Sequence, residues 1–282
     1  MSRVTRRRPV LRLDGERTTS RPDTLVAEEP LEIRVGGVPV SVTMRTPGDD
    51  FDLVAGFLVT EGVVDGAGQL TVMRYCAGAT ADGVNTYNVI DAALRPDTPP
   101  LDLSVQRNFY TTSSCGVCGK ASIDAIRTRT RWPVADDPVR LRPAVLAGLP
   151  DRLRAAQQVF DRTGGLHAAG LFDADGQLLC LREDVGRHNA VDKVVGWASR
   201  EGRLPLRGTV LLVSGRASFE LTQKALMAGV PALAAVSAPS SLAAELAEEA
   251  GMTLIGFLRG TTMNVYAGAH RLHLDSVAPG RV

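Results

Sequence analysis

The chain has 282 residues, 44% of them hydrophobic, and a formal net charge of +1 at pH 7. This length and apolar content predict one or two domains with a substantial core. A nearly neutral chain lacks the overall field typical of nucleic-acid or membrane-surface proteins, and no run approaches the roughly 20 apolar residues of a membrane span. The start is basic but lacks the apolar stretch of an export signal, so we expect a cytoplasmic protein with neither nucleic acid nor membrane as partner.

The first part of the chain predicts an arm followed by a β-hairpin. Residues 1–25 begin with a cluster of arginines and indicate a solvated, flexible arm. Two alternating runs, 31–35 and 38–44, then flank the pair Gly36-Gly37. Two glycines between alternating runs are a strong hairpin signal.

A helix and a second hairpin are predicted next. The pair Asp49-Asp50 is a candidate cap for a helix whose apolar positions within 51–59 share one face. Two further strands are expected near 70–76 and 84–90. A hairpin, a helix and a hairpin make a small α+β domain, which we assign to residues 26–105.

The segment 106–148 is poorly patterned and connects the small domain to the rest of the chain. It contains Cys115 and Cys118, each followed by glycine, with Lys120 and an amphipathic run behind them. Sulfur atoms at the amino end of a helix meet its positive dipole, and a nearby ammonium adds to that field. At least one thiol should therefore ionise easily, and we interpret the pair as a thiol reaction centre.

From residue 149 the pattern alternates regularly between strands and helices. A helix near 151–160 precedes a hairpin of 168–172 and 178–181, Asp184 is expected to open the next helix, and apolar strands then alternate with amphipathic helices. Continuous apolar strands between such helices are typical of parallel strands covered on both faces. The expected fold class of residues 149–282 is therefore α/β, a mixed sheet with helices on both faces.

Three polar clusters follow strands of this region, at residues 182–189, 214–218 and 257–264. Arginines, backbone N–H groups beside glycines, and small hydroxyls suit phosphate. Because ligands of such sheets bind at the carboxyl ends of the strands, the clusters predict a convergent anion or nucleotide site. We expect Arg187 and Arg216 near phosphate. The alternative, in which the clusters only cap helices and turns, stays open for some of these residues.

The other cysteines and the histidines leave further alternatives open. Cys76 and Cys180 lie in strand-like runs and are expected to be buried and inert. A structural zinc site needs four ligands, usually in paired clusters, and no second Cys-x-x-Cys exists, so no metal is expected. His167 is favoured as a core residue, and His188 is either a phosphate contact or a satisfied, partly buried side chain.

Five motifs resemble those of one known family. They are Ser114–Gly119, Thr163–Gly170, Glu183–Lys193, Ser214–Glu220 and Phe257–Gly260. Their sequences and their order closely resemble the formate dehydrogenase accessory sulfurtransferase family (FdhD/NarQ), and the resemblance runs over roughly residues 30 to 270.

The resemblance implies a cytosolic homodimer whose larger domain has a cytidine-deaminase-like fold. It implies a sulfurtransferase that accepts persulfide sulfur from a cysteine desulfurase. The acceptor is the bis-guanine-dinucleotide molybdenum cofactor (bis-molybdopterin guanine dinucleotide), which then enters the catalytic subunit of formate dehydrogenase. GDP or GMP should mimic this cofactor.

The resemblance also carries over site residues. Cys115 would hold the persulfide and Cys118 would assist. The family's cofactor-binding stretch corresponds to Phe257, Leu258, Arg259, Gly260, Thr261 and Thr262. Zinc-deaminase chemistry does not accompany the fold, because no Pro-Cys-x-x-Cys follows the strand that begins at Thr209.

Two other classes of function stay open. One is a delivery chaperone that binds the molybdenum cofactor through its thiols and transfers no sulfur. The other is a zinc-stabilised nucleotide-binding module.

Overall fold

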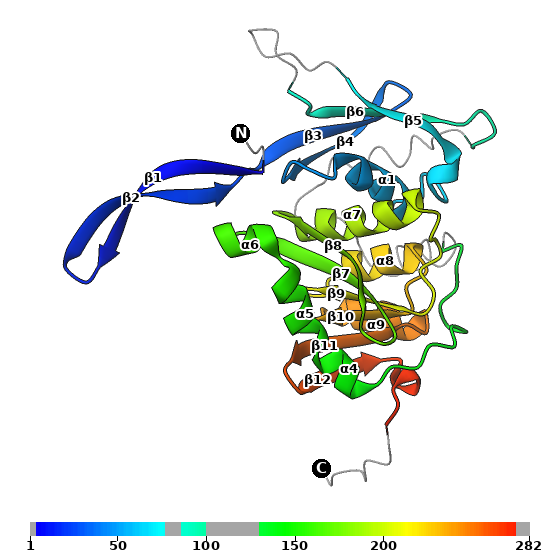
Figure 1. Cartoon of the computed structure of the whole chain (residues 1–282). Helices are drawn as coiled ribbons and strands as arrows, with labels where there is room; N and C mark the ends of the chain where they lie inside the picture. The colour runs from blue at the N-terminus through cyan, green and yellow to red at the C-terminus, as the bar shows by residue number, and fades with distance from the viewer. Residues whose placement is uncertain (1–3, 77–85, 100–129, 275–282) are drawn as a thin grey trace.

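The computed structural model describes residues 4–76, 86–99 and 130–274. Within these ranges the strands form a six-stranded sheet, a four-stranded sheet and a two-stranded ribbon (Figure 1). The layers between the two larger sheets are helical, and the ribbon projects from the body.

The six-stranded sheet is mixed, as expected. It contains β7 (His167–Asp173), β8 (Leu178–Asp184), β9 (Thr209–Val213), β10 (Ala232–Ala235), β11 (Thr253–Arg259) and β12 (Thr262–Ala267). The order is β12-β11-β10-β9-β7-β8. Strands β9, β10 and β11 are parallel, whereas β7 runs antiparallel to both its neighbours and β12 runs antiparallel to β11.

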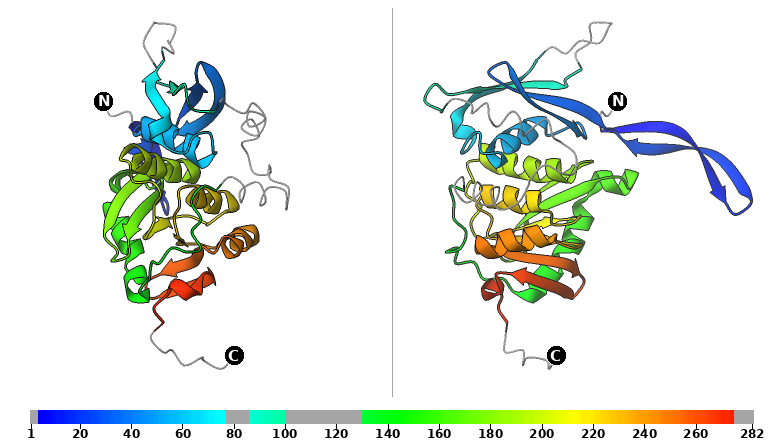
Figure 2. Two further views of the ribbon diagram at one scale, coloured as in Figure 1. Left: turned by 90° about the vertical axis from the view of Figure 1, so that its right-hand side faces the viewer. Right: turned by 180° about the vertical axis from the view of Figure 1, so that it is seen from behind.

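Helices cover both faces of this sheet (Figure 2). Helices α7 (Arg187–Arg200), α8 (Phe219–Met227) and α9 (Ser241–Glu249) lie on one face, and α4 (Pro143–Ala147) and α5 (Leu149–Ala156), which continues into α6 (Gln158–Thr163), lie on the other. Side chains alternate along each strand: Leu211 and Val213 pack toward α7–α9, whereas Val210 and Leu212 pack with Leu149 of α5. The expected helices on both faces are confirmed.

The four-stranded sheet contains the predicted hairpin. Its strands are β3 (Glu29–Val35), β4 (Val38–Arg45), β5 (Leu70–Tyr75) and β6 (Val89–Leu94), in the order β4-β3-β6-β5. Gly36 and Gly37 join β3 to β4 with φ angles of 58° and 81°, which is why two glycines stand there. Strand β6 lies later in the chain than the strand that was expected at 84–90. Helix α1 (Asp50–Thr60) follows β4 as predicted, and the short η1 (Ala67–Gln69) precedes β5.

Helix α1 is shared between the two larger sheets. A single core contains Leu31 of β3 and Leu53 and Leu58 of α1 together with Val191 and Val194 of α7. The small sheet therefore packs on α1, and α1 packs on the layer of helices that covers the six-stranded sheet. The two regions do not have separate cores.

The contact between α1 and α7 is made backbone to backbone. A Cβ atom on Gly56 would lie 1.8 Å from the carbonyl oxygen of Asp192, and one on Gly196 would lie 1.7 Å from the carbonyl oxygen of Asp52. Any side chain at either position would collide with the other helix. The two glycines are therefore required by the close approach of the helices.

A buried charge cluster holds three helices together beside this contact. The ammonium of Lys224 in α8 donates to Thr60 Oγ1 at 2.9 Å, to Glu61 Oε1 at 3.0 Å and to Asp192 of α7 at 3.0 Å. Burial alone would favour the neutral amine, but the carboxylates of Asp192 and Glu61 raise the pKa of Lys224 above its usual value. The cation therefore stays charged between α1, α7 and α8.

The expected flexible arm is instead an antiparallel ribbon of β1 (Thr5–Asp14) and β2 (Arg17–Val26). The turn between them, Gly15-Glu16, has φ 60° at its glycine, as two-residue hairpin turns with a leading glycine require. The sequence does not show this hairpin clearly, because three arginines are consecutive in β1, β2 is mostly polar, and each strand contains a proline. Leu11 and Leu13 share one face and are 67% and 69% exposed.

Replacing Gly196 by alanine should destabilise the protein. The added methyl group must push α1 and α7 apart, and overpacking of this kind costs about 1–3 kcal/mol even though alanine favours a helix. Urea unfolding of Gly196→Ala and Gly56→Ala should show that loss. Gly68→Ala, where a Cβ would meet nothing within 4 Å, is the control and should stay within about 0.5 kcal/mol of wild type. Equal stability of all three variants would contradict the close contact.

Replacing Lys224 by methionine should destabilise the protein by about 3–5 kcal/mol, because it leaves the buried carboxylate of Asp192 without its cation. Adding Asp192→Asn to Lys224→Met removes that charge and should restore part of the loss. The measurement is a double-mutant cycle in urea. A double variant that is as unstable as the sum of the single ones would show that the cluster is not coupled.

Candidate functional site

Strand ends that carry the three polar clusters meet at one edge of the mixed sheet. The registers place Asp184 of β8 opposite His167 of β7, and Val213 of β9 opposite Ala235 of β10, with Arg259 at the end of the next strand. We call this edge the strand-tip edge and define it by these five residues. All three clusters follow strands that end at this edge, as predicted, and their convergence on one anion or nucleotide stays a prediction.

The stretch from residue 257 to residue 262 forms the end of β11 and its turn into β12. Phe257 is exposed and has a left-handed backbone, φ 51°, at an irregularity in the strand pairing. A non-glycine residue in that region costs roughly 1–2 kcal/mol, and such strain is concentrated at functional sites. The Arg259 guanidinium lies 5.9 Å from the centre of the Phe257 ring, and its Nε donates to the carbonyl oxygen of Val236.

The six predicted binding residues are not equivalent. Arg259, Gly260, Thr261 and Thr262 are exposed along with the ring of Phe257. Leu258, by contrast, is fully buried in the core on the α5 side of the sheet. Its side chain cannot reach a ligand at the surface, so only its backbone is available there.

Ser237 connects the second cluster to the third. Its N–H donates to the carbonyl oxygen of Gly215 at 3.3 Å, and its own carbonyl accepts from the N–H of Phe257 at 3.1 Å. Ser214 Oγ accepts from the N–H of Ala168 at 2.9 Å and so attaches the same loop to β7. No sequence pattern pointed to Ser237, because it lies outside all three clusters.

The prediction that Asp184 opens a helix is wrong. Asp184 ends β8, and its carboxylate binds the surrounding loops. Its buried carboxylate accepts from the N–H of Gly186 at 2.8 Å, from Asn189 Nδ2 at 3.0 Å and from the N–H of Thr46 at 3.1 Å. The ammonium of Lys193 lies 2.8 Å away. Helix α7 begins three residues later, at Arg187, and the partners of Asp184 give it a structural role.

Two more members of the first cluster also act within the fold. Arg182 donates to Asp52 Oδ2 from Nη2 at 2.8 Å, which ties β8 to α1. Glu183 accepts from the N–H groups of Val159 and Phe160 at 3.0 and 2.8 Å, and so caps the start of α6. The alternative in which cluster residues serve capping and turns therefore holds for these side chains.

Arg187 and His188 remain at the strand-tip edge, where the first turn of α7 begins. His167 lies at the same edge and is half-buried, so the preference for a core residue was wrong. Burial lowers the pKa of His167, and the nearby charges of Arg187 and His188 lower it further. The guanidinium of Arg187 is therefore close enough to His167 to disfavour protonation of its ring. Arg216 is exposed in the neighbouring loop.

Glu220, in the first turn of α8, faces this positive group. His188 Nε2 lies 3.8 Å from Glu220 Oε2, an ion-pair distance that is too long for a hydrogen bond. The proximity of His188 is the main reason why the pKa of Glu220 is lowered to about 2. Partial burial opposes this shift, and the hydroxyl of Ser218 adds to it. Glu220 ends the motif Ser214–Glu220, but the sequence assigned it no role, although its position two residues after Ser218 at a helix start could have indicated one.

The proposed thiol centre cannot be placed, because Cys115 and Cys118 lie outside the described residues. The other cysteines are described: Cys180 is buried, and burial raises the pKa of its thiol to about 12, as expected for an inert core residue. Cys76 is only half-buried.

Two negative findings apply to residues 4–76, 86–99 and 130–274 alone. No cluster of three or more histidine, cysteine or acidic side chains there is arranged to hold a metal ion. No helix in those ranges combines the length and apolar character of a membrane span.

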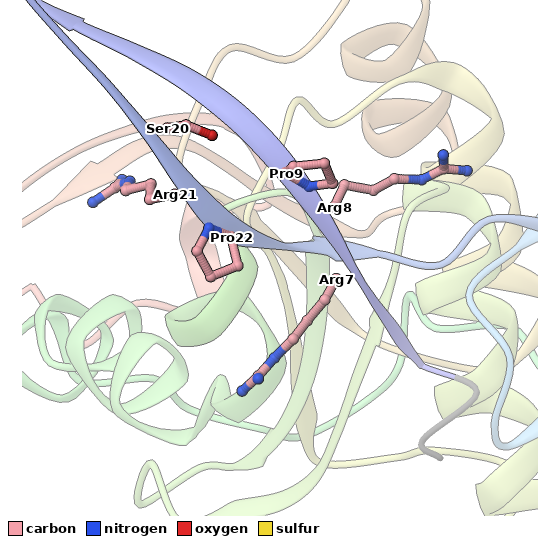
Figure 3. A pocket seen from close by; sticks show the side chains of 6 residues that line it. All are labelled: Arg7, Arg8, Pro9, Ser20, Arg21 and Pro22. Atoms are coloured by element: carbon pink, nitrogen blue, oxygen red, sulfur yellow. The ribbon is translucent and has the colours of Figure 1, made fainter.

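A separate hollow lies on the ribbon, away from the strand-tip edge. It is lined by Arg7, Arg8, Pro9, Ser20, Arg21 and Pro22 (Figure 3). None of the three clusters contributes to it, and it is an open groove between arginine side chains. We therefore place the candidate site at the strand-tip edge.

Comparison with known proteins identifies relatives over nearly the whole chain. The chain is 66% identical over 279 residues to a protein of Streptomyces avermitilis named "Sulfur carrier protein FdhD", which covers 99% of both chains. A protein of the same name from Mycobacterium tuberculosis is 58% identical over 275 residues, covering 96% of this chain and all of the relative.

A solved structure has the same fold. It belongs to a protein from Desulfotalea psychrophila that is described as a candidate formate dehydrogenase accessory protein, and it matches with a TM-score of 0.74 at 23% identity. The match covers 95% of this chain and 99% of the other. Residues 26–273 match the pattern of the FdhD/NarQ family. This chain belongs to the FdhD/NarQ family.

Proposed function

We propose that this protein is a sulfur carrier for formate dehydrogenase. It takes persulfide sulfur from a cysteine desulfurase and passes it to the bis-guanine-dinucleotide molybdenum cofactor before that cofactor enters the enzyme. Relatives at 58–66% identity that are named sulfur carriers support the transfer of sulfur. The observation that supports a nucleotide ligand is the exposed, strained Phe257 beside Arg259 at the strand-tip edge.

In this proposal the stretch 257–262 holds a guanine nucleotide end of the cofactor. An exposed aromatic ring offers a stacking surface for a base, and a guanidinium beside it offers charge-assisted hydrogen bonds to phosphate. The backbone N–H groups of the turn at Gly260 and the hydroxyls of Thr261 and Thr262 add neutral donors. The cofactor is cargo in this scheme, and GDP or GMP is its simplest probe.

The sulfur step belongs to Cys115 and Cys118. The thiolate of Cys115 attacks the terminal sulfur of the desulfurase persulfide. A new S–S bond forms on Cys115, the S–S bond of the donor breaks, and the donor cysteine leaves as a thiolate. The product is a reversible cysteine persulfide, with Cys118 as the assisting thiol.

We further propose a cytidine-deaminase-like larger domain and a cytosolic homodimer. The mixed sheet with three central parallel strands supports the fold assignment. Two copies would offer two guanine-nucleotide sites, which would match the two nucleotide ends of the cofactor. The loop after β9, Ser214–Ser218, contains no cysteine, so zinc-deaminase chemistry is not part of the proposal.

Replacing Cys115 by alanine should abolish the persulfide. Mass spectrometry of the wild-type chain after incubation with a cysteine desulfurase and cysteine should show one added sulfur, or 32 Da, about the mass of a sulfur atom. Cys180→Ala is the matched control and should still gain sulfur, because the thiol of Cys180 is buried. An unchanged adduct in Cys115→Ala would refute the assignment.

The delivery chaperone without sulfur transfer is tested in the same variants. If Cys115→Ala with Cys118→Ala still supports sulfurated, active formate dehydrogenase, the chaperone is correct and the sulfur carrier is wrong.

Replacing Arg259 by alanine should weaken GDP binding by about 10- to 100-fold, because a hydrogen bond to a charged group contributes about 1.5–3 kcal/mol. Isothermal titration calorimetry on the full chain measures this. Arg207, exposed just before the opposite end of β9, is the control, and Arg207→Ala should bind GDP like wild type. Equal affinities of both variants would remove the proposed role of the β11–β12 turn.

A further inference from the structure

Unpartnered polar atoms are concentrated at the strand-tip edge. Among the described residues, four buried side-chain nitrogen or oxygen atoms lack a hydrogen-bond partner, and three of them are Arg187 Nε, His188 Nε2 and Ser218 Oγ. The fourth, Arg271 Nε, belongs to a guanidinium whose other nitrogens donate to backbone carbonyls in the core. Buried polar groups are normally paired, so three exceptions in one place need a common explanation.

Ser218 lacks the helix-capping hydrogen bond that a serine at the matching position of the next helix makes. Ser218 and Ser240 both precede a helix, and their neighbours Ala217 and Pro239 form a parallel bridge, so the two serines occupy matching positions. Ser240 Oγ accepts from the N–H of Ala243 at 3.2 Å, as a capping serine does. Ser218 makes no such bond. Its hydroxyl interacts instead with the carboxylate of Glu220, whose pKa it helps to lower, so Glu220 holds both Ser218 and His188 in the free protein.

Charges around the three atoms favour an anion. Asp184, the nearest buried acid, is already neutralised by Lys193 at 2.8 Å and by three N–H donors. Glu220 is the other acid, and it faces His188 at 3.8 Å with its side chain 49% exposed. The guanidinium of Arg187 supplies the fixed positive charge that an anion needs, and the ring nitrogen of His188 and the hydroxyl of Ser218 can add donors.

The group is separate from the β11–β12 turn. Neighbouring strands lie about 4.8 Å apart, so β9 is roughly 10 Å and β8 roughly 19 Å from β11 in the sheet order. Arg259 and Arg187 therefore belong to places that are several strands apart along the strand-tip edge. A ligand with several phosphate groups could reach both places along the strand-tip edge.

We propose that Arg187, His188 and Ser218 form a second subsite for an oxyanion, which takes a phosphate group. The group lies apart from the turn at residues 257–262. In the free protein the carboxylate of Glu220 lies next to His188, and the anion replaces it there. The phosphate comes either from a guanine nucleotide, in which case the inference rests on the proposed function, or from free phosphate or pyrophosphate. The two sources share the same recognition chemistry.

Calorimetry on the full chain with GDP, guanosine and inorganic pyrophosphate distinguishes the sources. Ser218→Ala and Arg187→Ala should weaken GDP or pyrophosphate at least 5-fold and leave guanosine unchanged. Glu220→Gln should tighten the phosphate ligands several-fold, because it removes the competing carboxylate. If only pyrophosphate responds, the subsite stands and the nucleotide part of the proposed function fails.

Ser240→Ala is the matched control for Ser218→Ala. Loss of a capping bond should lower the melting temperature of Ser240→Ala by about 2–4 °C with unchanged affinity. Ser218→Ala removes no capping bond to a backbone N–H, so it should melt within about 1 °C of wild type while losing affinity. The subsite is overturned if neither GDP nor pyrophosphate binds the wild type, or if Ser218→Ala and Arg187→Ala bind them as tightly as wild type.

Discussion

The contact between α1 and α7 through Gly56 and Gly196 determines how the rest of the structure is arranged. Because carbonyl oxygens of one helix occupy the space of a missing Cβ on the other, the helices cannot slide or separate without a large change. The small sheet is thereby attached to the layer that covers the six-stranded sheet. The same helix, α7, begins at the strand-tip edge, so this contact also fixes where Arg187 and His188 lie.

Polar residues at the candidate site fall into two groups with different environments. Asp184, Arg182, Glu183 and Asn189 have their hydrogen bonds satisfied inside the protein, and they join β8 to α1, α6 and β4. Arg187, His188 and Ser218 each keep a buried side-chain atom without a hydrogen bond of normal geometry, and the backbone of Phe257 is strained. The first group supplies a rigid frame, and the second group is available for a ligand. Rigid support is what a site needs to hold a large, charged cargo in one orientation.

Much of this could be predicted from the sequence, and the failures have physical causes. Apolar strands and helix periods predicted the mixed sheet and both covering layers, because burial on two faces leaves a clear pattern. Clusters after strands predicted the strand-tip edge, because parallel strands end together. The pattern could not show which polar residue is satisfied: Asp184 and Glu220 look alike in sequence, and only their partners in space distinguish them. The ribbon was missed because its arginines hide strand alternation.

The ribbon of β1 and β2 also bears on how this chain avoids self-association through its exposed edges. Free edges of strands can template a further strand from another molecule. The register sets Pro9 directly opposite Pro22, so each edge of the ribbon has one position without an N–H group. An incoming strand would lose a ladder bond at that position on either side, and the neighbouring arginines would add charge repulsion between like copies. The long hairpin can thus expose Leu11 and Leu13 to solvent without starting the growth of a fibril from its edges.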